Sequence, residues 1–411
     1  MIHRTSFLMT LLLCLLCVSL QAQLLPNNPT VQGNTRFALQ LYKQLSKASH
    51  QTQDNNVFVS PYSISSALAM TYAGAKGSTA QQMAHTLHFS PKSLDKDYQF
   101  LNHHFNHLNS KGLQLSIVNA IWGEKSKKFQ PSFLKLNHTY YQAKLGKLDF
   151  KNQPKKSRIV INQWVAKKTQ DKIKNLIPSG MISGNTRMVL TNAIYFQGKW
   201  KLRFDKSNTR KMNFIAHKIT YPDIKFMHIT NSIKYTENAI LQAIELPYAG
   251  DKVSTVVLLP KHKNGLYQVE QWLTSKTYQA LTTSLFHTKV ILHLPKFKMT
   301  KNVPLKNALK ALGMRIPFTK QADFSKIMQS ESLVISEVVH KAFIEVSEKG
   351  TEAAAATAVI MSRPRSTSYN PEQPIPPKIF KADHPFMFII KDNTTGSILF
   401  IGRLITPKQA I

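Results

Sequence analysis

The chain has 411 residues and a formal net charge of +33, from 54 Lys and Arg against 21 Asp and Glu. Apolar residues make up 43%, and only 15 Gly and 20 Pro occur, so the composition excludes a disordered or collagen-like chain. A chain of this length can bury a sizeable core, and length alone allows two or three domains. The positive excess indicates an anionic partner, such as nucleic acid, an acidic glycan or an anionic membrane surface.

The amino terminus has the pattern of a secretory signal. Arg4 precedes an apolar run, Leu8 to Leu20, of about 13 residues, which is shorter than the roughly 20 that a spanning helix needs. We expect residues 1–22 to be a signal peptide cleaved after Ala22; an uncleaved anchor is the alternative. The mature protein would be secreted and extracellular, or held in a periplasm or lumen, depending on the source. Loss of Arg4 would lower its net charge from +33 only to +32.

Both cysteines of the chain, Cys14 and Cys17, lie inside that segment. The mature protein would therefore contain no thiol. This excludes disulfides, a cysteine-ligated zinc and a cysteine nucleophile.

Three segments have helical patterns. Thr35 to Lys47 places Phe37, Leu41 and Leu45 at helical spacing, and a second helix is expected from Ser63 onward, closed by residues 74–77. A lysine-rich helix is expected over Asn152 to Leu176, with the apolar side chains of Ile161, Trp164 and Ile173 available for burial.

Short runs rich in β-branched residues indicate strands at Met188–Tyr195, Val253–Leu259 and Val290–Leu294. Helices dominate the first half of the chain and strands the second, without a βα rhythm. The pattern predicts an α+β domain built on a large mixed sheet.

Residues 348–361 combine small side chains with the absence of proline, whereas Pro364, Pro371, Pro374, Pro376 and Pro377 follow. The alanine run alone favours a helix. As a strand, the same residues would place Thr351, Ala353, Ala355, Thr357 and Val359 on one face. The proline-rich part cannot be a central strand. A strand-compatible segment tethered to an exposed loop is a candidate for insertion into a sheet.

Several blocks, taken in order, resemble the serpin family along nearly the whole mature chain. They are Asn56–Met83, LTNAIYFQGKW at Leu190–Trp200, Glu245–Pro260, LPKF at Leu294–Phe297, Val334–Ala342, and Ala382–Leu404 with ADHPFMFII and GSILFIGRL. Residues 348–359 resemble the hinge of an inhibitory serpin. The resemblance implies one domain, residues 23–411, with a large mixed central sheet, surrounding helices and an exposed reactive-centre loop over about 348–379.

The resemblance also implies a mechanism without catalysis or a cofactor. A serine protease would attack the loop and form an acyl-enzyme, and the freed hinge would insert as a new strand of the main sheet. The metastable fold would supply the driving force, and distortion of the protease would block deacylation. The chain would be an irreversible suicide-substrate inhibitor and not an enzyme.

Residue roles carried over from the family fall into three groups. The hinge comprises Glu348, Gly350, Thr351, Glu352, Ala353, Ala354, Ala355, Ala356 and Thr357. A hydrogen-bonded shutter beneath the opening sheet comprises Ser63, Asn192 and His340. A breach at its top comprises Trp200 and the salt-bridging pair Lys296 and Glu348. Without the family, His340 would be interpreted as an ordinary core histidine.

The reactive bond is less fixed, because the loop is long. The family's usual spacing from Glu348 reaches Pro364, a poor residue for cleavage. We expect Arg365–Ser366, which suits the acidic pocket of a trypsin-like protease. Met361–Ser362 would suit a chymotrypsin-like or subtilisin-like enzyme, and further alternatives are Arg363, Ile360 and Tyr369.

Remaining signals are weaker. His103, His104 and His107 have ligand spacing on a helix, but no acidic partner is evident, so we predict a solvated segment and no metal site. Asn137 and Asn393 lie in glycosylation sequons. Basic clusters at 125–128, 151–158, 167–174 and 199–211 could bind a heparin-like polyanion. The alternative function is a non-inhibitory, polyanion-binding serpin; we expect a monomer without a membrane span.

Overall fold

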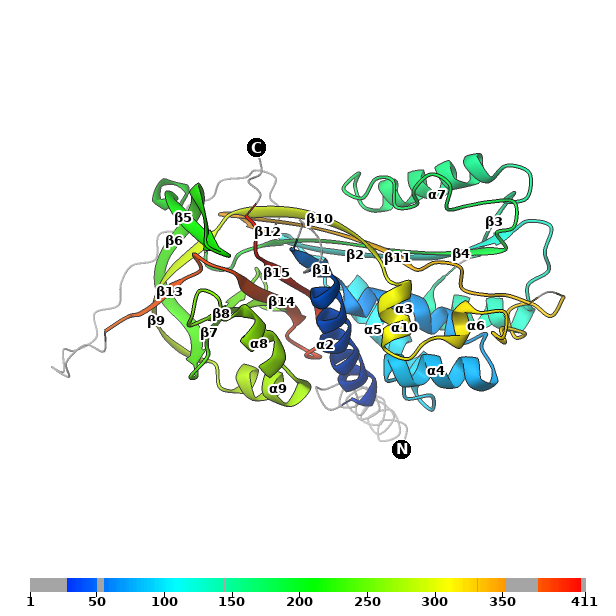
Figure 1. Ribbon diagram of the computed structural model, residues 1–411, viewed down its shortest axis with the longest axis horizontal. Coiled ribbons are helices and arrows are strands. Elements are labelled where there is room, and N and C mark those ends of the chain that lie inside the picture. Colours follow the sequence, from blue (N-terminus) through cyan, green and yellow to red (C-terminus); the bar gives the residue numbers. More distant parts are fainter. Residues whose placement is uncertain (1–27, 50–54, 144, 331, 352–375, 408–411) are drawn as a thin grey trace, which may run out of the picture.

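The computed structural model describes residues 28–49, 55–143, 145–330, 332–351 and 376–407. Within them the strands form two sheets (Figure 1). The six-stranded sheet has the order β10 (Phe297–Pro304), β11 (Val339–Ser347), β12 (Gly350–Thr351), β4 (Met188–Lys199), β2 (Leu113–Glu124) and β3 (Leu145–Leu148).

The nine-stranded sheet curves away from the first. Its order is β1 (Val57–Val59), β15 (Ile398–Leu404), β14 (Phe386–Asp392), β8 (Val253–Pro260), β7 (Leu241–Pro247), β6 (Ile219–Glu237), β9 (Phe286–Pro295) and β13 (Lys378–Lys381), and β5 (Arg210–Ala216) pairs with β6.

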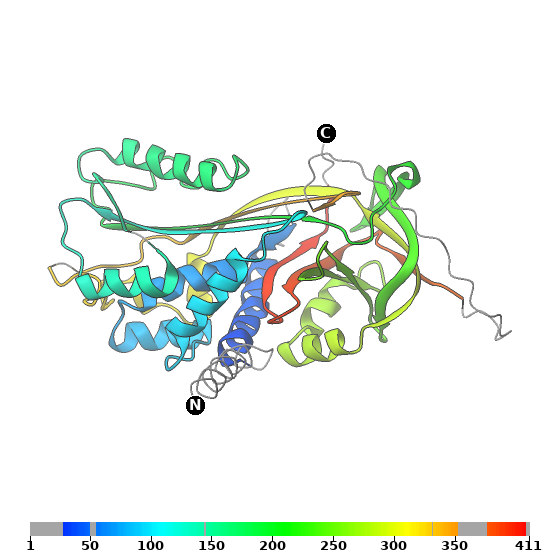
Figure 2. The same ribbon diagram turned by 180° about the vertical axis from the view of Figure 1, so that it is seen from behind.

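Helices cover both faces of the six-stranded sheet (Figures 1 and 2). One face carries α7 (Pro154–Lys168). The opposite side carries α3 (Pro61–Tyr72), α4 (Gly77–Leu87), α5 (Leu94–Asn106), α6 (Pro131–Tyr141) and α10 (Lys306–Ala311). Around the second sheet lie α2 (Pro29–Ser49), α8 (Leu266–Trp272) and α9 (Ser275–Thr283), and the 3-10 turns are η1 (Lys206–Asn208) and η2 (Ile316–Phe318).

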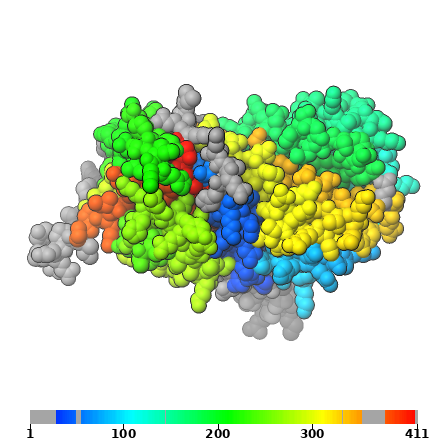
Figure 3. Space-filling model, viewed as in Figure 1, coloured from blue at the N-terminus to red at the C-terminus, as the bar shows by residue number. Residues whose placement is uncertain are grey.

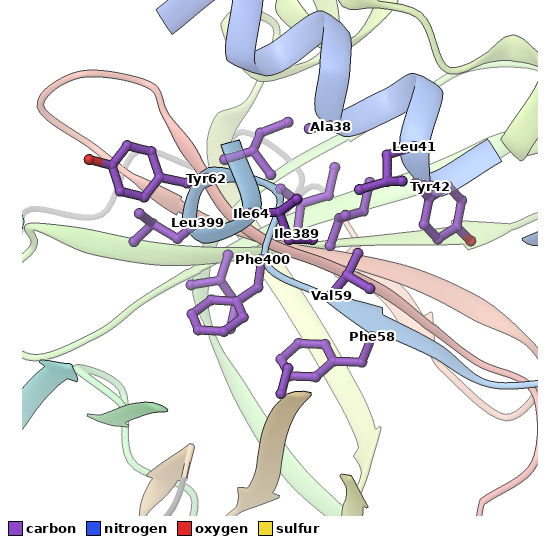
Figure 4. Packing of buried hydrophobic residues seen from close by; sticks show 14 of the residues in the cluster. Ala38, Leu41, Tyr42, Phe58, Val59, Tyr62, Ile64, Ile389, Leu399 and Phe400 are labelled. Carbon is purple, nitrogen blue, oxygen red and sulfur yellow. The ribbon is translucent and has the colours of Figure 1, made fainter. Parts of the chain in front are cut away.

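The main core joins helix α3 to both sheets. Ser60 caps the helix by accepting a hydrogen bond from the backbone N–H of Ser63, and Pro61 occupies the first turn, where no N–H is needed. Nearly all of α3 is buried, together with apolar side chains of α2, β1, β14 and β15 (Figure 4). Phe58 stacks on Phe400 with ring centroids 5.2 Å apart. This main cluster joins both sheets, and a smaller one lies beneath α7, so the chain forms a single α+β domain rather than two or three.

Most of the predicted elements are confirmed. The first two predicted helices correspond to α2 and α3, and the three predicted strands lie within β4, β8 and β9. The block Asn56–Met83 contains β1, α3 and the start of α4, and LPKF spans the junction of β9 and β10.

The prediction of one lysine-rich helix over 152–176 is wrong in extent. Helix α7 ends at Lys168, and Ile173 is buried in the irregular segment that follows it. Ile161 and Val165 of α7 pack with Val118 and Ala193 on the sheet face, so tertiary packing holds both parts.

Candidate functional site

The seam between β11 and β4 is the central feature of the six-stranded sheet. Residues 340–343 of β11 pair directly, in parallel, with residues 192–195 of β4. At the carboxyl ends of both strands, which we call the upper end of the seam, β12 lies between them. It runs antiparallel to both, with Thr351 opposite Val346 and Gly198. The beginning of the predicted hinge, Gly350 and Thr351, is therefore a strand, and the alanine run for which a helix was the alternative lies outside the described residues.

Thr351 is anchored in this position. Its side chain is 1% exposed, and its hydroxyl lies 2.6 Å from the hydroxyl of Tyr248, which also lies 2.7 Å from that of Thr255. Burial raises the pKa of Tyr248 well above its usual value, so the phenol keeps its proton. Sequence reasoning missed Tyr248, although it belongs to the Glu245–Pro260 block, because its contact with Thr351 joins positions 103 residues apart.

Gly350 fits where no larger residue would. Its φ is +138°, and a Cβ there would lie 1.9 Å from the carbonyl oxygen of Gly198. Close strand approach explains the glycine at the first position of β12.

The three predicted breach residues lie together at the upper end of the seam. The indole N–H of Trp200 donates to the carbonyl oxygen of Ser347 at 3.0 Å, and the ring stacks on Tyr248 with centroids 4.6 Å apart. Lys296 Nζ lies 2.8 Å from Glu348 Oε2, and the Thr209 hydroxyl donates to Glu348 Oε1.

Opposing effects act on the Glu348 carboxyl. Burial would raise its pKa, but the hydrogen bonds from Lys296 and Thr209 outweigh burial and hold the pKa below its usual range. Glu348 is therefore an ionised tether immediately before the hinge.

The predicted shutter residues also meet, beneath the paired part of the seam. Asn192 Nδ2 donates to the Ser63 carbonyl oxygen at 2.7 Å, to the Ser63 hydroxyl and to Asn119 Oδ1. His340 Nδ1 lies 2.7 Å from Asn192 Oδ1, and the Ser60 backbone N–H donates to His340 Nε2 at 3.0 Å.

These partners define the state of His340. Because a backbone N–H donates to Nε2, the proton of the neutral ring lies on Nδ1 and is donated to Asn192. Complete burial lowers the pKa of His340 to about 3. The histidine thus bridges β11, β4 and the start of α3 as a neutral hydrogen-bonding group.

The irregular segment between α7 and β4, residues 169–187, crosses the outer face of the seam. Lys341 Nζ on β11 donates to the carbonyl oxygen of Lys174 at 2.6 Å. Lys172 Nζ lies 5.9 Å from the centroid of Phe343, also on β11. We call residues 169–187 the crossing segment; it ties α7 to the far side of the seam.

Several expected sites fall outside the described residues. These are the signal peptide 1–22, the hinge beyond Thr351, and the candidate cleavage residues Ile360, Met361, Ser362, Arg363, Arg365, Ser366 and Tyr369. The structure therefore describes the sheet that would receive the loop, and the upper end of the hinge.

The histidine trio is only partly as expected. His103 and His107 are exposed and stacked, but His104 Nε2 lies 3.1 Å from Asp392 Oδ1, an acidic partner 288 residues away that sequence spacing could not reveal. Within the described residues no cluster of His, Cys, Asp or Glu is arranged to hold a metal ion.

The two sequons differ in exposure. Asn137 is 2% exposed and donates to the Phe133 carbonyl oxygen, so it is closed to a glycan in the folded chain. Asn393 is exposed, although its amide donates to the Asp251 carbonyl oxygen. Across the described part of the chain, no helix is both long and apolar enough to cross a bilayer.

A two-sheet α+β domain with a short strand seated between two strands of its main sheet defines the class of fold. Comparison with known proteins agrees. The sequence model of the serpin (serine protease inhibitor) family matches residues 32–407. The chain belongs to the serpin family.

Individual relatives match almost end to end. Human Serpin B4 is 39% identical over 400 residues, covering 92% of this chain and all of the relative. The leukocyte elastase inhibitor of Bos taurus is 38% identical over 383 residues, covering 91% of this chain and 98% of that one. The solved structure of native protease nexin-1 with heparin superposes with a TM-score of 0.80 at 29% identity, covering 92% of this chain and 99% of that chain.

Proposed function

We propose that this serpin is an irreversible suicide-substrate inhibitor of a serine endopeptidase, and not an enzyme. The single observation that carries the proposal is the position of Gly350 and Thr351, seated between β11 and β4 and antiparallel to both. A protease that cuts the loop would free the rest of the hinge to continue this strand while still held as an acyl-enzyme.

The existing register predicts the partners of each inserted residue. Each step beyond Thr351 moves one residue back along both neighbours, so Thr357 would lie opposite His340 in β11 and Asn192 in β4. Thr351 points inward to Tyr248, and alternation places Thr357 on the same inward side. Insertion would therefore separate His340 from Asn192 and put a hydroxyl between them. This supports the shutter role of Ser63, Asn192 and His340.

The lower end of the seam suits the residues that would reach it. In the same register Val359 lies opposite Leu190 and Met361 opposite Met188, the first residue of β4. A cavity of about 60 Å³ there is lined largely by apolar side chains, including Ile177, Met188 and Leu190. Residues 352–361 would extend the strand by about 33 Å.

This register favours Arg365 as the residue before the cut. The strand would end near Met361, leaving residues 362–365 to connect it to the acyl bond at the lower pole. With Met361 as the bait residue, the acyl bond would have to lie at the last paired position. A trypsin-like target follows from an arginine at the cleavage site.

Further parts of the proposal rest on the sequence. Residues 1–22 are proposed as a signal peptide, so the inhibitor acts as a secreted monomer. The net charge of +33 favours a polyanionic partner, as does the heparin in the solved structure of protease nexin-1. A non-inhibitory, polyanion-binding serpin is the second candidate, and the small residues 353–356 of the hinge argue against it.

Incubation with trypsin and with subtilisin, followed by denaturing electrophoresis and amino-terminal sequencing, tests the proposal. We expect a covalent complex with trypsin and a released peptide that begins at Ser366. A peptide beginning at Ser362 would move only the bait residue. Cleavage by both proteases without any covalent complex would contradict inhibition and favour the second candidate.

A further inference from the structure

Helix α7 carries a concentrated positive charge on its outer face. Lys155, Lys156, Lys167 and Lys168 are all exposed, and α7 forms the outer rim of the molecule above the six-stranded sheet (Figure 3). Exposed Lys174 continues the charge into the crossing segment. We call these five lysines the α7 basic surface.

The charges of this surface are not balanced locally. Residues 150–174 contain a single acidic residue, Asp171, and among the described residues no ion pair is formed by Lys155, Lys156, Lys167 or Lys168. Some lysines elsewhere are paired, as in Lys201 with Asp251 and Lys211 with Asp223. Such a surface attracts an anion without first breaking salt bridges.

Fold stability does not explain the lysines in the first turn of α7. Lys155 and Lys156 face the positive end of the helix dipole, and no acidic residue offsets them there. The cationic first turn is unfavourable for the isolated helix, so helix stability does not account for it.

The spacing of the lysines fits an extended partner. At 100° per residue Lys156, Val160, Gln163 and Lys167 share one stripe, and the two lysines lie about 16 Å apart along the axis. Val160, Gln163 and Lys167 are exposed like Lys156. The stripe contains no aromatic side chain, which surfaces for single-stranded nucleic acid use to stack bases. A sulfated polysaccharide chain satisfies both the length and the charge.

We propose that the α7 basic surface binds an extended sulfated polyanion, and that the bound polyanion slows insertion of the hinge. The second part rests on the proposed inhibitory function. Ile161 and Val165 seat α7 on β2 and β4, whereas Lys174 and Lys172 of the crossing segment contact Lys341 and Phe343 of β11.

The mechanical argument follows from these contacts. Insertion separates β11 from β4, so either α7 or the crossing segment must move relative to one of them. A polyanion that binds Lys156, Lys167 and Lys174 together would hold α7 and the crossing segment as one unit. More acyl-enzyme would then hydrolyse before the strand is complete, and the stoichiometry of inhibition would rise.

Binding is tested without any protease. The variant Lys156→Ala/Lys167→Ala is compared with Lys263→Ala/Lys320→Ala, which removes equal charge from exposed lysines outside the four basic clusters. Affinity for size-fractionated heparin is measured over a range of salt. We expect the α7 variant to lower the salt-dependence slope by about 2, and the control variant to leave it nearly unchanged. Heparin oligosaccharides too short to span 16 Å should bind the wild type and the α7 variant equally weakly.

Equal loss of affinity in both variants, or no retention of the wild type near physiological salt, would overturn the site. Tighter binding of duplex DNA than of heparin at the same salt would overturn the class of partner. Thermal unfolding of each variant establishes that it is folded.

The regulatory part is tested by the stoichiometry of inhibition of trypsin. Heparin should raise it at least twofold for the wild type and leave the α7 variant unchanged. A wild-type stoichiometry that heparin does not change would overturn the coupling while leaving the binding site intact. Absence of any covalent complex without heparin would instead refute the inhibitory function.

Discussion

Replacing Thr351 by arginine separates the native fold from the insertion reaction. Thr351 is 1% exposed, lies between Val346 and Gly198, and has its hydroxyl 2.6 Å from that of Tyr248. No carboxylate is among these neighbours. An arginine kept in this position would be a buried, unpaired charge.

The cost of burying the arginine, compared with the bonds that seat β12, decides whether the variant hinge stays in the sheet. An unpaired buried charge costs several kcal/mol. Seating β12 gains the Tyr248 hydrogen bond and a few ladder bonds, each worth roughly 1 kcal/mol. The variant hinge should therefore leave the sheet, at a cost to the native protein of about 2–3 kcal/mol and a few degrees in Tm. Insertion after cleavage, in contrast, requires the arginine to stay between Val346 and Gly198, at the start of the inserted strand.

The assay compares Thr351→Arg with Thr351→Ser, which keeps a small hydroxyl side chain. We expect Thr351→Arg to unfold near the native Tm, to be cleaved by trypsin and to form little covalent complex, because deacylation outruns insertion. Its cleaved form should lack the large gain in Tm expected of the cleaved wild type. Thr351→Ser should remain an inhibitor. Undiminished complex formation by Thr351→Arg would refute the insertion reasoning.

Three more results follow from other residues. Because the pKa of His340 is about 3 when folded and near 6.5 when unfolded, the unfolded chain binds the extra proton, and stability present above pH 6.5 is lost as pH falls. At pH 4.5 that loss is roughly 2–3 kcal/mol, so denaturant unfolding of His340→Gln should show a correspondingly shallower acid dependence; equal slopes would contradict the assignment. Trp200→Phe removes the N–H donated to Ser347 and should cost about 1–2 kcal/mol in urea unfolding, and an unchanged midpoint would argue against that bond. Arg365→Ala should abolish the complex with trypsin while subtilisin still cleaves the loop, and a persistent trypsin complex would place the bait elsewhere.

The sequence predicted local structure well where the pattern was local. The helical spacing in α2 and the β-branched runs in β8 and β9 are sufficient to predict those elements, because each reports which side chains one element buries. From the resemblance to the family we expected His340, Asn192 and Ser63 to form one hydrogen-bonded group. In the structure the three residues lie within hydrogen-bonding distance of one another through Asn192.

Contacts between distant segments could not be predicted from spacing alone. Tyr248 acquires its role only because β12 runs between two strands, and Asp392 meets His104 only after β14 has joined the second sheet. The end of α7 at Lys168 was missed for a related reason. Ile173 is buried by tertiary packing in an irregular segment, so its apolar character did not mark a helix.

The seam also has a polarity. Where β11 and β4 touch directly they run parallel, whereas Gly350 and Thr351 run antiparallel to both. Antiparallel pairing is slightly more stable per residue than parallel pairing. Completion of the strand would therefore exchange one short parallel ladder for two long antiparallel ones. Part of the free energy that would drive the proposed trapping reaction is therefore stored in the parallel direction of these two neighbouring strands.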